Sequence, residues 1–160
     1  MKNYNYSFGF FLEKVILASD KINVFIPREI EYYIICNLEK SLQNKELSSN
    51  TQINDFLNGN EQPKKIADNC LIISGMFPTR CSHIGGGDIT PIIWTGTQAY
   101  YLEHSKTNET LFLNLAEGFI QYMDIILVMN HMTEPFLLQE KTLKQLTQVG
   151  SKFPNYFWSI

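Results

Sequence analysis

The sequence predicts an all-α protein, a single domain spanning residues 1–160 with about six helices and a central apolar helix near 61–77. Two observations lead to this prediction. Apolar residues recur at helical spacing over stretches longer than ten residues, and residues that favour helix starts precede these stretches. In addition, two apolar segments each carry a glycine near the middle, Gly75 and Gly96. Because glycine weakens a helix, it usually marks a close backbone approach, which places both segments at the centre of the core.

The first two helices follow from apolar spacing. An amphipathic stripe predicts a helix near the start of the chain, and the period breaks over Asp20–Ile26. Pro27 suits a first helical turn, and the helix that it opens should run to about Gln43. The first stripe comprises Phe8, Phe11, Leu12, Val15 and Ile16, and the buried side of the second helix comprises Ile30, Tyr33, Ile34, Leu38 and Leu42.

Three longer helices are predicted at the centre, over Asn60–Phe77, Asp88–His104 and Asn108–Asn130. The first is apolar nearly all round, and the proline after Phe77 should end it. A short helical turn around Phe56 precedes these helices, and a last helix should begin at Thr133–Pro135 and end at Gly150. A rival interpretation makes Leu71–Ser74, Leu111–Leu113 and Ile125–Met129 strands, but sustained helical spacing favours helices.

Composition and charge exclude several classes of function. The chain has 160 residues, of which 44% are hydrophobic and 18% charged, a globular composition. A net charge of -3 gives no basic footprint for nucleic acid. No apolar run is long enough to predict membrane insertion. Three cysteines without CxxC spacing favour a reducing cytoplasm.

The sequence carries no recognisable catalytic or metal signature. Cys81 and His83 lie too close together, with no companion pair, for a structural zinc site. The loop Gly85–Gly87 lacks the lysine of a phosphate-binding loop, and Asp88 is placed to cap the next helix. We therefore predict no catalytic residue, no metal and no cofactor.

The segment from Leu71 to Tyr100 contains the patterns S-G-x-F-P and G-x-x-A-Y. In these patterns it resembles a family of uncharacterised bacterial helical proteins. The chain departs from the family at Pro91 and Ile92, where paired tyrosines are usual. The resemblance implies a bacterial helical domain and no particular chemistry.

Two functions are compatible with these observations. The first is a non-enzymatic protein-interaction domain, which binds another protein or a second copy of itself. The aromatic tail at 152–160 would then provide an interface through Tyr156, Phe157 and Trp158, unless it folds back over its own core. The alternative is a small-ligand binder or enzyme with a pocket between the helices around Gly75 and Gly96. Its expected lining is Arg80, His83, Trp94 and Tyr100.

Overall fold

The computed structural model describes residues 4–43, 55–59, 62–78 and 89–130. In these ranges the chain forms a short helical turn at 55–58 and six longer helices, and it contains no strand. The prediction of an all-α fold with about six helices is therefore confirmed. The six helices are α1 (Tyr4–Ile22), α2 (Arg28–Gln43), α4 (Pro63–Met76), α6 (Thr90–Thr107), α7 (Thr110–Glu117) and α8 (Phe119–Asn130).

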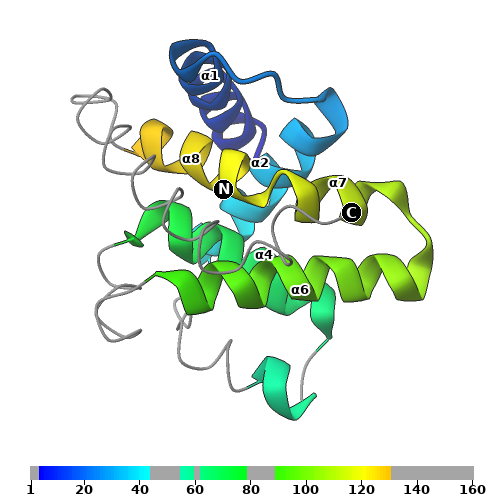
Figure 1. Ribbon diagram of the computed structural model, residues 1–160. Helices are drawn as coiled ribbons and strands as arrows, with labels where there is room; N and C mark the ends of the chain where they lie inside the picture. Colours follow the sequence, from blue (N-terminus) through cyan, green and yellow to red (C-terminus); the bar gives the residue numbers. More distant parts are fainter. Residues whose placement is uncertain (1–3, 44–54, 60–61, 79–88, 131–160) are drawn as a thin grey trace.

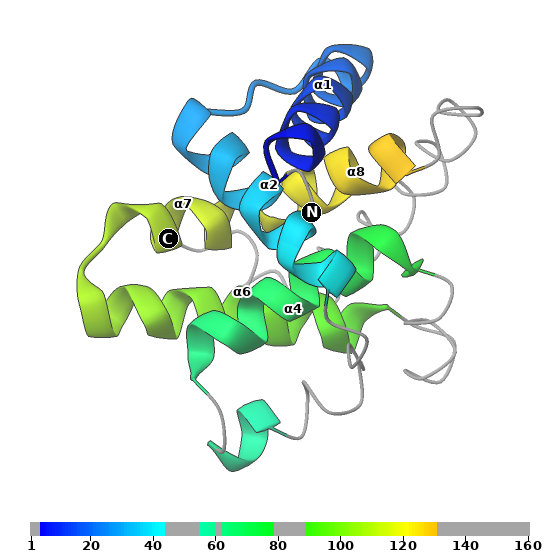
Figure 2. The same cartoon turned by 180° about the vertical axis from the view of Figure 1, so that it is seen from behind.

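The helices pack around α4 and α6, which lie side by side (Figure 1). α8 packs against α4, and α7 packs against α6. α1 contacts both α2 and α8, and α2 also reaches α4, as the reverse view shows (Figure 2). As a result, α4 is in contact with helices from both halves of the described chain.

The central position predicted for α4 is confirmed by its burial. Between Ile66 and Gly75 every residue except Asn69 is buried. The helix begins at Pro63 and ends at Met76, where the backbone N–H of Phe77 donates to the carbonyl of Ile73. The proline after Phe77 explains why the helix stops there, since a residue before proline avoids helical geometry.

Both predicted glycine contacts are also confirmed. A Cβ atom added to Gly75 would lie 2.6 Å from Cβ of Ile126 on α8. A Cβ atom added to Gly96 would lie 2.6 Å from ring carbons of Phe119 and 2.8 Å from Cβ of Cys70. Each glycine therefore lies where a neighbouring helix leaves no room for a side chain.

The single helix predicted over Asn108–Asn130 is wrong, because the chain bends by 70° between α7 and α8. Asn108 has a positive φ of 58° and ends α6, so it does not begin the next helix. The bend is at Gly118, where an added Cβ atom would lie 2.6 Å from the ring of Tyr122. Because glycine has no side chain, the ring of Tyr122 can pack directly against the backbone at this bend.

No single helix among those described is long and apolar enough to cross a membrane. The bent pair of α7 and α8 reaches the required length and apolarity only when the two helices are taken together.

The buried stripe of α1 differs from the prediction at one edge. Phe11, Val15, Ala18 and Ile22 face the core, whereas Ile16 is 42% exposed. These four residues share one side of the helix, and Ile16 lies beyond its edge. Asn23, with φ of 56°, ends the helix before the connection to α2.

Candidate functional site

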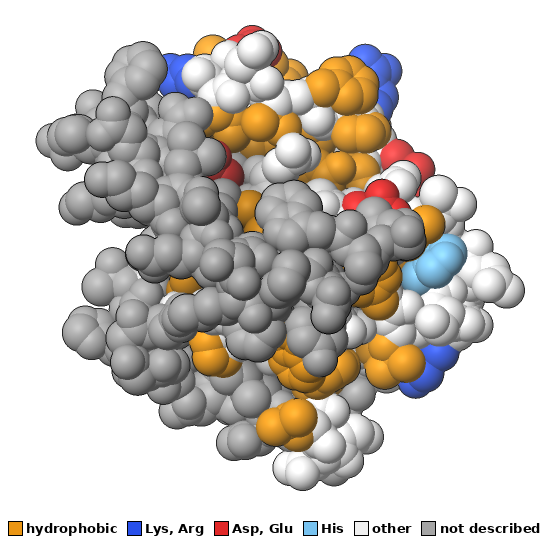
Figure 3. Space-filling model, viewed as in Figure 1, with side chains coloured by type: hydrophobic (Ala, Val, Ile, Leu, Met, Phe, Trp, Pro, Cys, Tyr) orange, Lys and Arg blue, Asp and Glu red, His pale blue; other side chains and the backbone are white. Residues whose placement is uncertain are grey.

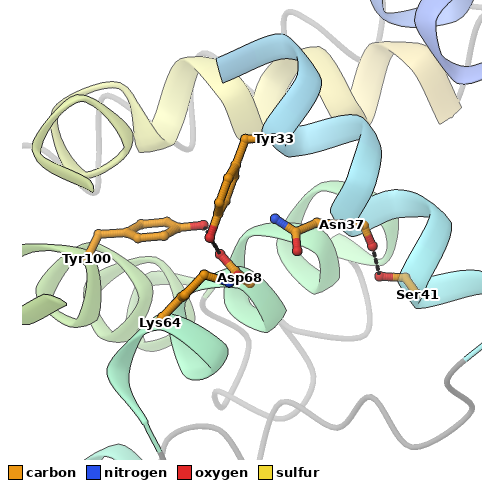
Figure 4. A network of polar contacts seen from close by, with 6 residues as sticks. All are labelled: Tyr33, Asn37, Ser41, Lys64, Asp68 and Tyr100. Atoms are coloured by element: carbon orange, nitrogen blue, oxygen red, sulfur yellow. Dashed lines mark hydrogen bonds and ion pairs between the residues drawn. The ribbon is translucent and has the colours of Figure 1, made fainter. Parts of the chain in front are cut away.

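Asp68 is a buried carboxylate on α4 that is contacted by three other side chains (Figure 4). The hydroxyl groups of Tyr33 and Tyr100 donate to its Oδ1 atom at 2.6 Å and 2.8 Å. The Nζ atom of Lys64 lies 3.2 Å from Oδ2. Since Tyr33 belongs to α2 and Tyr100 to α6, this cluster joins three helices through one carboxylate. We call these four residues the Asp68 cluster.

Local sequence explains how each member reaches this place. Lys64 and Asp68 are four residues apart on α4, the spacing that brings two side chains together on a helix. Tyr100 is fully buried and its ring stacks near Phe112 at a centroid distance of 6.4 Å. Tyr33 is half-buried, and the ammonium of Lys64 lies over its ring at 5.4 Å from the centroid. The apolar surroundings therefore hold both hydroxyl groups in line with the carboxylate.

Burial governs the protonation of the Asp68 cluster. It raises the pKa of Asp68, while donation from Tyr33, Lys64 and Tyr100 acts in the opposite direction. Burial together with the neighbouring carboxylate raises the pKa of Tyr33 and of Tyr100, so that both hydroxyl groups keep their protons. Each oxygen of Asp68 thus receives at least one donor. The arrangement favours a fixed carboxylate with compensated charge over a free general base.

A recess with a volume of about 190 Å³ opens beside the Asp68 cluster, between α2 and α4. Asp68 and Lys64 form part of its wall, and Figure 4 shows the side chain of Asn37 extending into the same region. Ser41 at the recess donates its hydroxyl to the backbone carbonyl of Asn37 at 2.8 Å. In the described part of the chain the lining is polar except for one isoleucine. Its residues are Asn37, Lys40, Ser41, Lys64, Lys65, Asp68, Asn69 and Ile72.

The two described residues of the predicted ligand lining do not lie together. Tyr100 is buried and bonded to Asp68, behind the recess. Trp94 is half-buried, and its ring packs edge-on against Phe56 at a centroid distance of 6.0 Å. Trp94 and Tyr100 are six positions apart on α6, so their side chains leave the helix on different sides.

The other predicted site residues lie outside the described residues. This holds for Arg80 and His83, and for the predicted interface residues Tyr156, Phe157 and Trp158. The space beside Gly75 and Gly96, where the alternative hypothesis places a pocket, is occupied by Ile126 and Phe119. The recess between α2 and α4 is lined by neither Gly75 nor Gly96, so it is not the predicted pocket.

None of the described residues that line the recess was predicted from the sequence as a site residue. The available signal was the lone acid within a nearly continuous apolar segment, Ile66–Gly75, together with the helical spacing from Lys64 to Asp68. Tyr33 was predicted to be buried, but nothing in the sequence assigns it to Asp68, because the two residues are 35 positions apart. Within the described ranges, no group of three or more histidine, cysteine, aspartate or glutamate residues is arranged to hold a metal ion.

Asp124 on α8 is a second buried carboxylate, and its Oδ1 atom has no hydrogen-bond partner among the described residues. Burial raises its pKa from 3.8 to about 6. Because the folded protein holds this proton more tightly than the unfolded chain, Asp124 lowers stability as the pH rises from about 4 to about 6.

We therefore expect Asp124→Asn to stabilise the protein at pH 8 by about 1–3 kcal/mol, and by less at pH 4. The reason is that the substitution removes a buried charge that the wild type carries only at the higher pH. Urea unfolding at both pH values measures the difference. An equal effect at pH 4 and pH 8 would contradict the assignment of the buried charge to Asp124.

No family model matches the sequence, and comparisons with curated proteins and with solved structures find no significant match. The resemblance to bacterial helical proteins through the S-G-x-F-P and G-x-x-A-Y patterns therefore stays a prediction.

Proposed function

We propose that the protein is a small-ligand binder whose site is the recess between α2 and α4. One observation carries the proposal: polar side chains from two helices converge on a recess of about 190 Å³ whose wall is fixed by the buried Asp68 cluster. Ligand sites are typically concave and pre-formed, with a few polar groups held in place by the surrounding structure. Asp68 supports the site by linking α2, α4 and α6.

Binding without catalysis is the form of this function that the geometry favours. Both oxygens of Asp68 already accept hydrogen bonds, and the hydroxyl groups of Tyr33 and Tyr100 are committed to it. A general base needs a carboxylate that can reach a proton on the substrate, and Asp68 is already occupied by donors from the protein.

For the location of the protein we propose the bacterial cytoplasm, as predicted from the sequence.

A screen of small polar molecules by two-dimensional ¹H–¹⁵N NMR tests the proposal. A ligand of the recess should shift the amide signals of Asn37, Ser41 and Asn69 in a saturable way. Ser41→Phe should abolish the shifts by filling the recess. Ser105→Phe is the matched control, since each serine donates to the carbonyl four residues before it and Ser105 is exposed on α6. Saturable binding that survives Ser41→Phe, or no binding by any compound, would overturn the proposal.

A second candidate function, the protein-interaction domain predicted from sequence, is favoured by the surface around α1. Of the eight exposed large hydrophobic residues in the described chain, five lie within residues 10–32. Figure 3 shows hydrophobic side chains gathered over this part of the molecule. The five residues are Phe10, Ile16, Leu17, Phe25 and Tyr32.

The partner that we propose for this surface is a second copy of the chain or another protein. Sedimentation analysis at increasing concentration tests self-association, and a photo-crosslinking residue at position 25 tests a different partner. Position 102 is the control, since Leu102 is also exposed but belongs to α6. A monomer that forms no adduct specific to position 25 would exclude this candidate.

A further inference from the structure

We propose that the ligand of the recess is a small molecule carrying a doubly charged oxyanion, with a phosphate monoester as the best fit. This inference rests on the proposed ligand-binding function and specifies the chemistry of that ligand. Among the described residues that line the recess, three are lysines, Lys40, Lys64 and Lys65, and one is an acid, Asp68. These described residues have a formal charge of +2, which matches the charge of about -2 on a phosphate monoester near neutral pH.

The carboxylate does not make the recess a cation site. Oδ1 of Asp68 receives two tyrosine hydroxyl groups and Oδ2 faces the ammonium of Lys64. Its charge is thus compensated from within the protein, in directions fixed by α2, α4 and α6. A cationic ligand would have to displace these donors and would meet the three lysines.

The charge of the recess is local, because the chain as a whole is acidic, with 13 basic and 16 acidic residues. The first turn of α4 contributes to this local charge, since it contains two lysines and no acidic residue. The partial positive charge at the start of a helix repels lysine side chains in its first turn, and a bound anion would reduce this repulsion.

The remaining described polar residues of the lining are Asn37, Asn69 and Ser41. The two asparagines carry amide N–H groups of the kind that donate to phosphate oxygens, whereas the hydroxyl of Ser41 already donates to the backbone carbonyl of Asn37 at 2.8 Å. The described residues of the lining include no arginine, the residue whose planar fork pairs with a carboxylate through two parallel bonds. Lysine binds phosphate as a point charge, so this combination favours phosphate over a single carboxylate.

An NMR titration with inorganic phosphate tests the inference, at constant ionic strength and with acetate and a neutral sugar as comparison probes. Phosphate should shift the amide signals of Asn37, Ser41 and Asn69 at lower concentration than acetate does. Lys40→Gln and Lys65→Gln should each raise the dissociation constant for phosphate about two- to fivefold. Lys106→Gln should not change it, because Lys106 is exposed on α6, away from the recess lining. Lys40 and Lys65 are also exposed, so that their substitution leaves the core intact.

The outcomes separate this inference from the proposed function. If the neutral sugar binds at the recess and phosphate does not, the recess is a ligand site but the inference is wrong. If phosphate binds equally well to Lys40→Gln, Lys65→Gln and the wild type, the inference is also wrong. If neither phosphate nor any compound of the wider screen shifts these signals, both the inference and the proposed function fall.

Discussion

Asp68→Ala is expected to lower the free energy of unfolding by about 3–5 kcal/mol, the typical cost of breaking a buried charged cluster. The substitution removes the acceptor of both tyrosine hydroxyl groups at once. Tyr100 is fully buried, so its hydroxyl would lose its bond with no access to water. An unsatisfied buried polar group carries a full desolvation cost. Urea unfolding followed by circular dichroism measures the change.

Two further variants separate the hydrogen bonds from the charge. Asp68→Asn keeps one carbonyl acceptor where Tyr33 and Tyr100 now donate, so its loss of stability should be smaller than that of Asp68→Ala. Lys64→Gln removes the ion pair and the contact of the ammonium with the ring of Tyr33. Because the lysine side chain is 39% exposed, this loss should cost about 1 kcal/mol or less. A loss below about 1 kcal/mol for Asp68→Ala would show that the cluster does not hold the three helices together.

The helices and the core were predictable because local signals determine them. Helical spacing over 108–130 places Phe112, Leu115, Phe119 and Met123 on the inward side, and all four are buried. The bend at Gly118 was not predicted, because one glycine within a periodic apolar stretch is compatible with a continuous helix. Its effect depends on how the ring of Tyr122 packs against it.

The recess was less predictable than the fold. Its lining combines residues near the end of α2 with residues near the start of α4, and the relative position of these helices depends on tertiary packing. Lysines and asparagines on helices are usually solvated, so that Lys40 and Asn69 carry no signal of their own in the sequence. Tyr100 was identified as a site residue, but its role is different: it contacts the carboxylate from behind the recess.

Gly96→Leu is expected to lower the free energy of unfolding. Overpacking a core usually costs about 1–3 kcal/mol, and we expect a loss near the upper end of this range. Gly96 is buried, and the Cβ atom alone would lie 2.6 Å from the ring of Phe119 and 2.8 Å from Cβ of Cys70. Thermal unfolding followed by circular dichroism measures the change. An unchanged melting temperature would contradict the close approach of α6 to α4 and α8.

Alanine variants identify the cause of this loss. Gly9 is exposed within α1, and a Cβ atom there would meet nothing within 4 Å. Gly9→Ala should therefore stabilise the protein by about 0.5–1 kcal/mol through helix propensity alone. Gly96→Ala has the same gain in propensity but meets Phe119, so it should destabilise, and Phe119→Leu should reduce that effect in the double variant. If Gly96→Ala stabilised the protein as Gly9→Ala does, the ring of Phe119 would have room to move, and α6 and α8 would not require glycine at this contact.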